Sequence, residues 1–543
     1  MRRGIPFCLT LMGLAASPTA FDGERQGALL ADHEARFLTS DRCVACHNGL
    51  ATSKGDDISI GLDWRTTLMA NSSRDPYWQA SARRETLDHA SSAAAIEDEC
   101  SICHMPIPRY LAMQRGQPNK LFAKLALEGL GEEARQARDG VTCSVCHQIA
   151  ADRLGTAASF NGGFVVNGAD AAGVRVVYGP WDIDPGLRRV MRTSTGGFEP
   201  RRGEHQRSSD LCASCHTLTT KALGPNGQEI GSLPEQMPYA EWLHSEYREA
   251  RSCQSCHMPL VTEEAAISRV LGEPRATVRR HQFLGANFLM QRLFSRYHDQ
   301  LGTQAQPQEL AGAAEKTIAF LQSQSALVSV STPRVNGNRL EARVSVDNLG
   351  GHKLPTAYPS RRAWLHVTVR DRTRHIVFES GALNADGSIR GNDNDTNAAR
   401  FEAHYTQIRN ADEVQIYESI LQGAQGEVTT GLLSAVGYLK DNRILPHGFD
   451  KNTASVDVAV HGAASADSRF TEKGHTLDYS VALDGAQGPY EFEVELRFQP
   501  IGFRWARNLK PYAASEVQSF TAKFESMAEA SAVTLAHAVR TSE

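Results

Sequence analysis

Ten of the chain's eleven cysteines stand in five copies of one pentapeptide, Cys-x-x-Cys-His. In this spacing two thiols can add across the vinyl groups of one haem, and the histidine that follows can bind its iron. The pattern therefore predicts five covalently attached c-type haems and one-electron chemistry at iron. The attaching cysteines would be Cys43, Cys46, Cys100, Cys103, Cys143, Cys146, Cys212, Cys215, Cys253 and Cys256. The histidines beside them, which would be the proximal iron ligands, are His47, His104, His147, His216 and His257.

Other uses of paired cysteines explain the pattern less well. A zinc site uses two Cys-x-x-Cys pairs, or one pair with two later histidines, and needs no histidine directly after each pair. A disulfide framework would not repeat one spacing five times, and a thioredoxin-like motif occurs once within a βαβ unit. Haem attachment is the interpretation that accounts for every copy.

The ligand on the opposite face of each iron decides what a haem can do. A second histidine gives a closed electron-transfer haem, a methionine raises its potential, and an empty position can bind a substrate. Three histidines stand in contexts that favour a distal role: His205 before the fourth motif, His281 after the fifth, and His352 behind two glycines. The weaker distal candidates are His89, His244, His298 and Met69.

The C-terminal half holds further candidate ligands and no cysteine. Asp393 and Asp395 lie in an oxygen-rich run that could hold calcium, but the spacing matches no complete calcium loop, so an ordinary Asx-rich turn is favoured. Arg361, Arg362 and Trp364 either anchor haem propionates or simply begin a strand. The formal net charge of −5 and the lack of a basic tract argue against a nucleic-acid partner.

The N-terminus has the pattern of an export signal. Arg2 and Arg3 precede a short apolar stretch, and small residues follow it. We therefore expect residues 1–20 to be a signal peptide that carries the eleventh cysteine, Cys8, and no transmembrane segment after it. Export agrees with haem attachment, which takes place outside the cytoplasmic membrane, and predicts a periplasmic or cell-surface location.

The elements that must position these residues divide the chain. All five motifs lie in a loop-and-helix domain expected over residues 21–305, followed by a connecting helix over 306–324 with Leu310, Ala314, Ile318 and Leu321 at helical spacing. Over 325–525 the period changes to two, which predicts an antiparallel β-sandwich, and residues 526–543 are expected to form a tail. The fold class is therefore multidomain: a multihaem cytochrome c domain and a β-sandwich domain.

Local patterns within these domains give finer expectations. Alternation at 340–346, 365–369, 456–460 and 490–498 predicts strands. The stretch 160–178 is glycine-rich and predicts a hairpin, 432–439 predicts a helix or long loop, and the alanine-rich stretch 514–540 predicts a helix.

Four segments resemble bacterial multihaem cytochromes c. They are the tryptophan-bounded segment 64–78, Cys-x-x-Cys-His-Met-Pro at 100–106 and 253–259, and Gly-His-Lys-Leu-Pro-Thr at 351–356. The chain looks like the group related to the tetrahaem cytochromes of ammonia oxidation and to hydroxylamine-oxidoreductase-like haem packing. The resemblance implies mostly bis-histidine haems that stack in pairs, with His205, His281 and His352 at distal positions. Where relatives have a histidine, this chain has Met69.

These features predict a pentahaem electron carrier that relays electrons between redox proteins, such as a quinol-linked or an outer-membrane cytochrome. An enzyme is the alternative, in which one haem keeps an open site and acts on a small nitrogen or sulfur compound. A component of a cytochrome filament or surface complex is the third interpretation. Electron transfer without catalysis is favoured.

Overall fold

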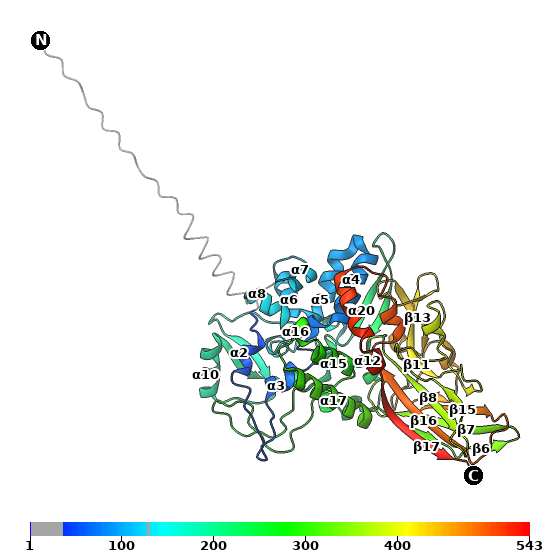
Figure 1. Ribbon diagram of the computed structural model, residues 1–543. Coiled ribbons are helices and arrows are strands. Elements are labelled where there is room, and N and C mark those ends of the chain that lie inside the picture. Colours follow the sequence, from blue (N-terminus) through cyan, green and yellow to red (C-terminus); the bar gives the residue numbers. More distant parts are fainter. Residues whose placement is uncertain (2–35, 128–130, 543) are drawn as a thin grey trace.

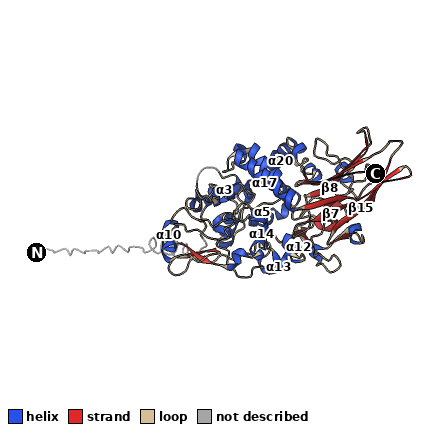
Figure 2. Cartoon of the chain, turned by 90° about the horizontal axis from the view of Figure 1, so that it is seen from below, coloured by secondary structure: helices blue, strands red, loops and turns tan. Residues whose placement is uncertain are grey.

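The computed structural model describes residues 36–127 and 131–542 together with Met1. Helices and two small sheets make up the described chain as far as residue 324, and most of the strands follow. Figures 1 and 2 show the strands gathered at the end of the molecule that holds the C-terminus. The chain is thus multidomain and combines helices with several antiparallel sheets. The predicted signal peptide, with Arg2, Arg3 and Cys8, lies outside the described residues apart from Met1.

The helical part consists mainly of short helices. Their bounds are α2 Ser40–Val44, α3 Ile60–Arg65, α4 Pro76–Asp88, α5 Ala93–His104, α6 Pro106–Gln114, α7 Leu121–Leu125, α8 Glu132–Arg138, α9 Cys143–Cys146, α10 Pro185–Thr195, α11 Ser209–Ala213, α12 Pro238–Leu243, α13 Tyr247–Ala250, α14 Cys253–His257, α15 Phe288–Arg296, α16 His298–Leu301 and α17 Pro307–Gln324. Two small sheets interrupt them: β1 (Arg175–Gly179) with β2 (Phe198–Arg202), and β3 (Leu218–Leu223) with β4 (Glu229–Gln236).

Helix α17 occupies the predicted connecting segment. Pro307 begins it, and the side chains of Gln306 and Glu309 form a capping box that satisfies free amide groups of its first turn. The four apolar residues at helical spacing, Leu310, Ala314, Ile318 and Leu321, are all buried. The apolar stripe predicted from the sequence is therefore the face that packs against the protein.

The strand-rich part contains two larger sheets. Its strands are β5 Ala326–Val330, β6 Arg334–Asn336, β7 Arg339–Asn348, β8 Arg362–Arg370, β9 Ile376–Ser380, β10 Gln407–Ile408, β11 Ile416–Gly423, β12 Val428–Thr429, β13 Ala435–Asp441, β14 Phe470–Thr471, β15 Gly474–Ala482, β16 Glu491–Gln499 and β17 Val533–Thr541. One sheet has the order β10-β15-β7-β5, with β14 and β6 beside it, and the other has the order β12-β11-β8-β16-β17, with β13 and β9 beside it. All pairs are antiparallel except β10 with β15.

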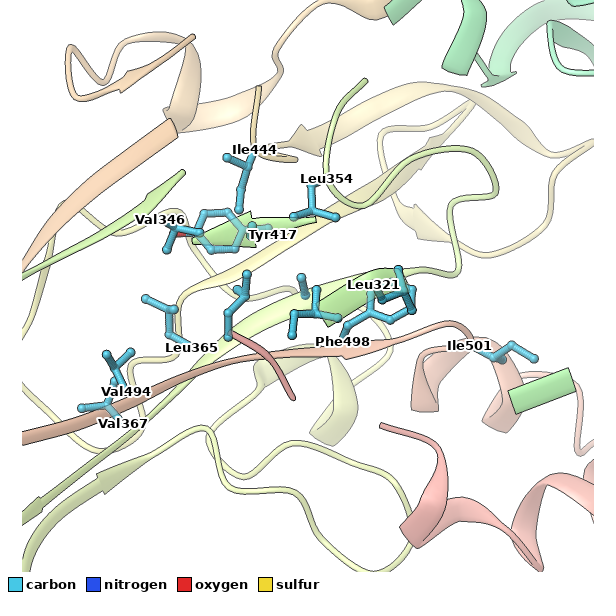
Figure 3. Close-up of a cluster of buried hydrophobic side chains, with 14 of the residues drawn as sticks. Leu321, Val346, Leu354, Leu365, Val367, Tyr417, Ile444, Val494, Phe498 and Ile501 are labelled. Atoms are coloured by element: carbon cyan, nitrogen blue, oxygen red, sulfur yellow. The ribbon is translucent and has the colours of Figure 1, made fainter. Parts of the chain in front are cut away.

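The two sheets share one hydrophobic core. Alternate residues of β7, such as Val346, face alternate residues of β8 and β16, such as Leu365 and Val494. Figure 3 shows these side chains meeting between the strands, joined by Leu321 of α17 and by Leu354 from the loop after β7. The helix and this loop therefore tie the helical part to the sheets through continuous apolar packing.

Several sequence expectations about the strands are wrong. Residues 456–458 form a short 3-10 helix with Val456 exposed, 435–441 form β13, and 160–178 form no hairpin because β1 pairs with the distant β2. The alanine-rich end forms α20 (Ser515–Glu525) and then β17, which pairs along β16. Residues 533–541, which were expected to belong to a tail, therefore form the edge strand of the seven-stranded sheet.

Candidate haem-binding site

The five Cys-x-x-Cys-His motifs adopt helical turns. In the motifs that begin at Cys43, Cys143 and Cys212, the amide of the histidine donates to the carbonyl of the first cysteine at 3.2, 3.0 and 2.9 Å. The other two motifs lie in α5 and α14. Positions i, i+3 and i+4 of a helix share one face, so each turn presents both thiols and the imidazole to the same side.

One cavity receives all of these side chains. It has a volume of about 1660 Å³, and its wall includes all ten motif cysteines and all five motif histidines. None of the ten thiols is in a disulfide, so each is free to form a thioether. Fifteen residues spread over positions 43–257 thus converge on one space, as covalent attachment of several neighbouring haems requires. The donor set fits the predicted group.

Main-chain carbonyls fix the orientation of four motif imidazoles. The Nδ1 atoms of His47, His104, His147 and His257 lie 2.5, 3.1, 2.6 and 2.5 Å from the carbonyl oxygens of Ile267, Ser72, Tyr178 and Leu284. A carbonyl can only accept, so Nδ1 carries the proton and Nε2 keeps its lone pair. This tautomer is the one that an iron-binding histidine uses, with its second nitrogen held by an outer partner.

Burial also keeps four of the motif histidines neutral, namely His104, His147, His216 and His257. It lowers the pKa of His104 and of His257 to about 4, and it lowers the pKa of His147 and His216 as well. Only the neutral imidazole can bind a metal ion. The four rings are therefore in the ligating form at any pH near neutrality.

Two further histidines face motif histidines across the cavity. The ring centroids of His147 and His281 are 6.4 Å apart with an angle of 24° between the ring planes, and those of His257 and His352 are 6.3 Å apart at 14°. Metal–nitrogen bonds of about 2 Å on each side, with the distance from nitrogen to ring centre added, separate two imidazoles on one metal ion by about 6 Å. Both pairs have the spacing and near-parallel planes of axial ligands to a shared iron.

The structure does not support the other histidine candidates. His205 is absent from the cavity wall, and its Nε2 lies 2.9 Å from the carbonyl oxygen of Ile149. His89, His244 and His298 are also absent from that wall, and their side chains contact Ser434, Ser455 and Asp299 respectively. Nearness to a motif in sequence therefore did not place these rings in the cavity wall. Met69 does line the cavity.

Thiols of different motifs approach one another. Hydrogen bonds join Cys43 to Cys143, Cys103 to Cys215, and Cys212 to Cys253. The first of these bonds lowers the pKa of Cys43 and raises that of Cys143, as expected when one thiol donates to the other. The first motif is therefore next to the third, and the fourth motif touches both the second and the fifth.

Arg361 places a positive charge in the cavity wall. Its guanidinium donates to the carbonyl of Thr356 at 3.0 Å, and no carboxylate among residues 36–127 and 131–542 forms an ion pair with it. Burial lowers the pKa of this guanidinium to about 10. Its neighbours in sequence are used differently, because Arg362 pairs with Asp395 and Trp364 donates to Gly381. Of the three predicted propionate anchors, only Arg361 has a geometry that suits an anionic group of the haem.

The predicted calcium ligands are already engaged. Asp395 accepts from Arg362 and from the amide of Ile389 at 2.8 and 2.7 Å, and Asp393 pairs with Arg400 at 2.6 Å. Because arginine side chains occupy both carboxylates, the structure favours the Asx-rich turn over a calcium site. The run forms the N-cap and first turn of α18 (Asp393–Thr396).

A second cluster, His404, Asp467 and His475, has the residue types of a metal site but the wrong tautomer. Both Nε2 atoms lie 3.1–3.2 Å from Oδ2 of Asp467. The Nδ1 of His404 faces the amide nitrogens of Asn442 and Gln415, whose own oxygens accept from main-chain amides. Nδ1 must therefore be an acceptor and Nε2 must carry the proton, which it directs at Asp467. The trio is a buried hydrogen-bonded group of the sandwich.

Within the described residues, no helix combines the length and the apolar character that crossing a bilayer requires. Searches of family models and of curated proteins find no match. Among solved structures the chain is similar to a penta-heme cytochrome c552 from Thermochromatium tepidum, with a TM-score of 0.51 and 14% sequence identity. The match covers 93% of this chain and 98% of that one. The likeness extends over nearly the whole fold.

Proposed function

We propose that this chain is a multihaem c-type cytochrome that carries five covalently bound haems and transfers electrons. The observation that carries this proposal is the convergence of all ten motif cysteines and all five motif histidines on one cavity. The similarity to a penta-heme cytochrome c552 supports it, since that protein shares the fold over most of both chains. When bound, the haems would supply reversible Fe(III)/Fe(II) cycling.

The chain's own residues would hold two of the five irons from both sides. His281 opposes His147, and His352 opposes His257, with carbonyl partners at His147, His257 and His352 that leave Nε2 free. Contacts between thiols place the fourth motif beside the second and the fifth, and the first beside the third. Cys146 is also close enough to Cys215 for their charges to interact, which joins the two groups. The motifs therefore form a connected and branched set suited to passing charge.

We further propose that the protein works outside the cytoplasmic membrane, with redox proteins as partners. Haem attachment at such motifs and the signal-like pattern at residues 1–20 support this location. The proposed domains are a haem domain over 21–305, a connecting helix over 306–324 and a sandwich that begins near residue 325. A relationship to the hydroxylamine-oxidoreductase-like group remains a proposal that rests on the motif resemblance.

A second candidate function is catalysis at a haem with an open site. Seven histidines of the described part line the cavity, five from the motifs and two opposite them, so the first, second and fourth motifs have no opposing histidine there. Met69 could serve one of these irons. An iron without a sixth protein ligand could bind a small nitrogen or sulfur compound.

Mass and spin state test both proposals. Intact mass spectrometry of the exported protein should show five haems, and a mass equal to the processed polypeptide alone would exclude the proposed function. Electron paramagnetic resonance of the oxidised protein counts low-spin and high-spin haems. A high-spin fraction that cyanide or nitrite converts to low spin would support catalysis, whereas five low-spin haems would exclude an open site.

A further inference from the structure

The loop that carries His352 docks onto the haem domain at several points. The hydroxyl of Tyr247 donates to the carbonyl of Leu349 at 3.2 Å. Gly351 packs so closely that a Cβ there would lie 3.3 Å from the ring of Trp242 and 3.2 Å from that of Tyr247. A side chain at position 351 would push the loop away, so glycine permits this close approach. The loop belongs to the sandwich in sequence but takes its position from α12 and α13.

Glu241 of α12 holds the segment directly after His352. Its Oε2 accepts from the amide of Lys353 at 3.1 Å and from the hydroxyl of Thr356 at 2.5 Å. These two contacts bracket the segment at both ends. Because the side chain of Glu241 is completely buried, water cannot replace either hydrogen bond.

A buried ion network fixes the carboxylate of Glu241 in turn. Its Oε1 lies 2.9 Å from the guanidinium of Arg443, which also pairs with Asp441, and Asp441 lies 2.7 Å from the ammonium of Lys353. Two carboxylates and two cations thus balance in a region without solvent. Such a network is costly to disturb, because removing one member leaves its partner charged and unpaired.

The backbone of Lys353 contacts both Glu241 and the imidazole of His352. The amide of Lys353 donates to Glu241, and the carbonyl of Lys353 lies 3.1 Å from Nδ1 of His352. The carboxylate and the imidazole are therefore held by two successive peptide groups of the same residue. Outer partners of this kind orient a metal-binding histidine and raise its basicity.

We propose that Glu241 is the positioning residue for His352: it holds the Lys353–Thr356 segment so that Nε2 of His352 faces His257 across the cavity. The proposal rests on the proposed function, in which these two histidines bind one iron. The negative charge of Glu241, held next to the backbone that follows His352, would favour the ferric state of that iron.

Glu241→Gln tests this role, because it keeps the shape of the side chain and removes its charge. We expect the oxidised holoprotein to lose part of one low-spin haem signal and to gain the same amount of high-spin signal. Added imidazole should restore the low-spin signal, since it can occupy the position that His352 leaves. The midpoint potential of the fraction that stays low-spin should rise.

Glu418→Gln is the matched control. Glu418 is also a buried carboxylate in an ion pair, 2.9 Å from Lys440, but it does not line the cavity or contact the His352 loop. The Glu418→Gln variant should leave every haem signal unchanged. Thr356→Val removes one of the two contacts with the loop and should shift the potential of the same haem by a smaller amount, which keeps the test valid if Glu241→Gln does not fold.

His352→Ala separates the two possible failures. If His352→Ala removes one low-spin haem but neither Glu241→Gln nor Thr356→Val changes any spin state or potential, Glu241 has no positioning role and the inference is wrong. If His352→Ala itself leaves all haems unchanged, the ligand assignment in the proposed function is wrong, and the inference fails with it.

Discussion

Replacing His281 with alanine should change the spin state of one haem without changing the number of haems attached. His281 faces His147 at a centroid separation of 6.4 Å, and no other histidine of the described part lies opposite that ring. The alanine leaves one axial position empty, so a ferric iron that was low-spin becomes high-spin. If the protein carries the five haems that we propose, about one fifth of the ferric haem should change.

The assay is quantitative electron paramagnetic resonance of the oxidised protein, with intact mass measured on the same sample. The mass should fall only by the difference between the two side chains, because the cysteines of the third motif are untouched. His281→Met should keep the iron low-spin and raise the potential of one haem, since a thioether favours the ferrous state.

His205→Ala provides the control that separates this reasoning from motif-based expectation. Both histidines resemble distal ligands in sequence, but the side chain of His205 is directed at the carbonyl of Ile149, outside the cavity wall. The His205→Ala variant should leave the high-spin fraction unchanged. The geometric argument is refuted if His205→Ala creates the high-spin haem and His281→Ala does not.

Three other perturbations test the remaining parts of the structure. Replacing Cys143 and Cys146 with serine should lower the intact mass by one haem, and an unchanged mass would contradict attachment at that motif. Asp441→Asn leaves the buried cations of Lys353 and Arg443 without the carboxylate that pairs with both. Denaturant unfolding should therefore show a loss of stability of about 3–5 kcal/mol. A loss below about 1 kcal/mol would contradict the proposed ion network. Burial raises the pKa of Glu85 to about 7 from 4.5, so this carboxyl binds a proton more tightly in the folded state. The free energy of unfolding should therefore fall by up to about 3 kcal/mol as the pH rises from 4.5 to 7. Glu85→Gln should flatten that part of the stability–pH profile.

The motif residues could be predicted from the sequence because their chemistry needs a fixed local spacing. One helical turn decides where two thiols and an imidazole point, so no distant contact is needed. The distal ligands are different, because their partners come from far along the chain. The sequence around His281 and His352 favours a distal role no more than the sequence around His205 does. Only the tertiary structure shows that the first two rings line the cavity and that the third does not.

Strands could be predicted where alternation coincides with burial on one face. β7 and β16 have strictly alternating apolar residues, and both overlap the predicted ranges 340–346 and 490–498. The valines at 456–460 also alternate, but Val456 is 78% exposed and residues 456–458 form a short 3-10 helix, so the alternation there marks no strand. β13 was missed because its apolar residues do not alternate: Gly437 and Lys440 interrupt them, and Lys440 is buried through its pairing with Glu418.

Glu241 illustrates a class of residue that the sequence leaves unmarked. It stands in a short helix with no metal-binding motif, and its partners Lys353, Asp441 and Arg443 lie more than a hundred positions away. Charged residues are ordinarily exposed, so the pattern favours a surface position for all four. Only the folded chain shows them to be buried and mutually paired.

The sandwich is therefore part of the haem site and not only a separate domain. It supplies His352 opposite His257, Arg361 in the cavity wall, and Asp441 and Arg443 in the network behind the loop. A boundary near residue 305, placed after the last motif, would cut through this site. The motif positions locate the covalent attachments, whereas the ligands on the opposite faces depend on how the two parts of the chain pack. Divergence in the sandwich could thus alter the axial ligands and potentials of the haems while every Cys-x-x-Cys-His motif stays intact.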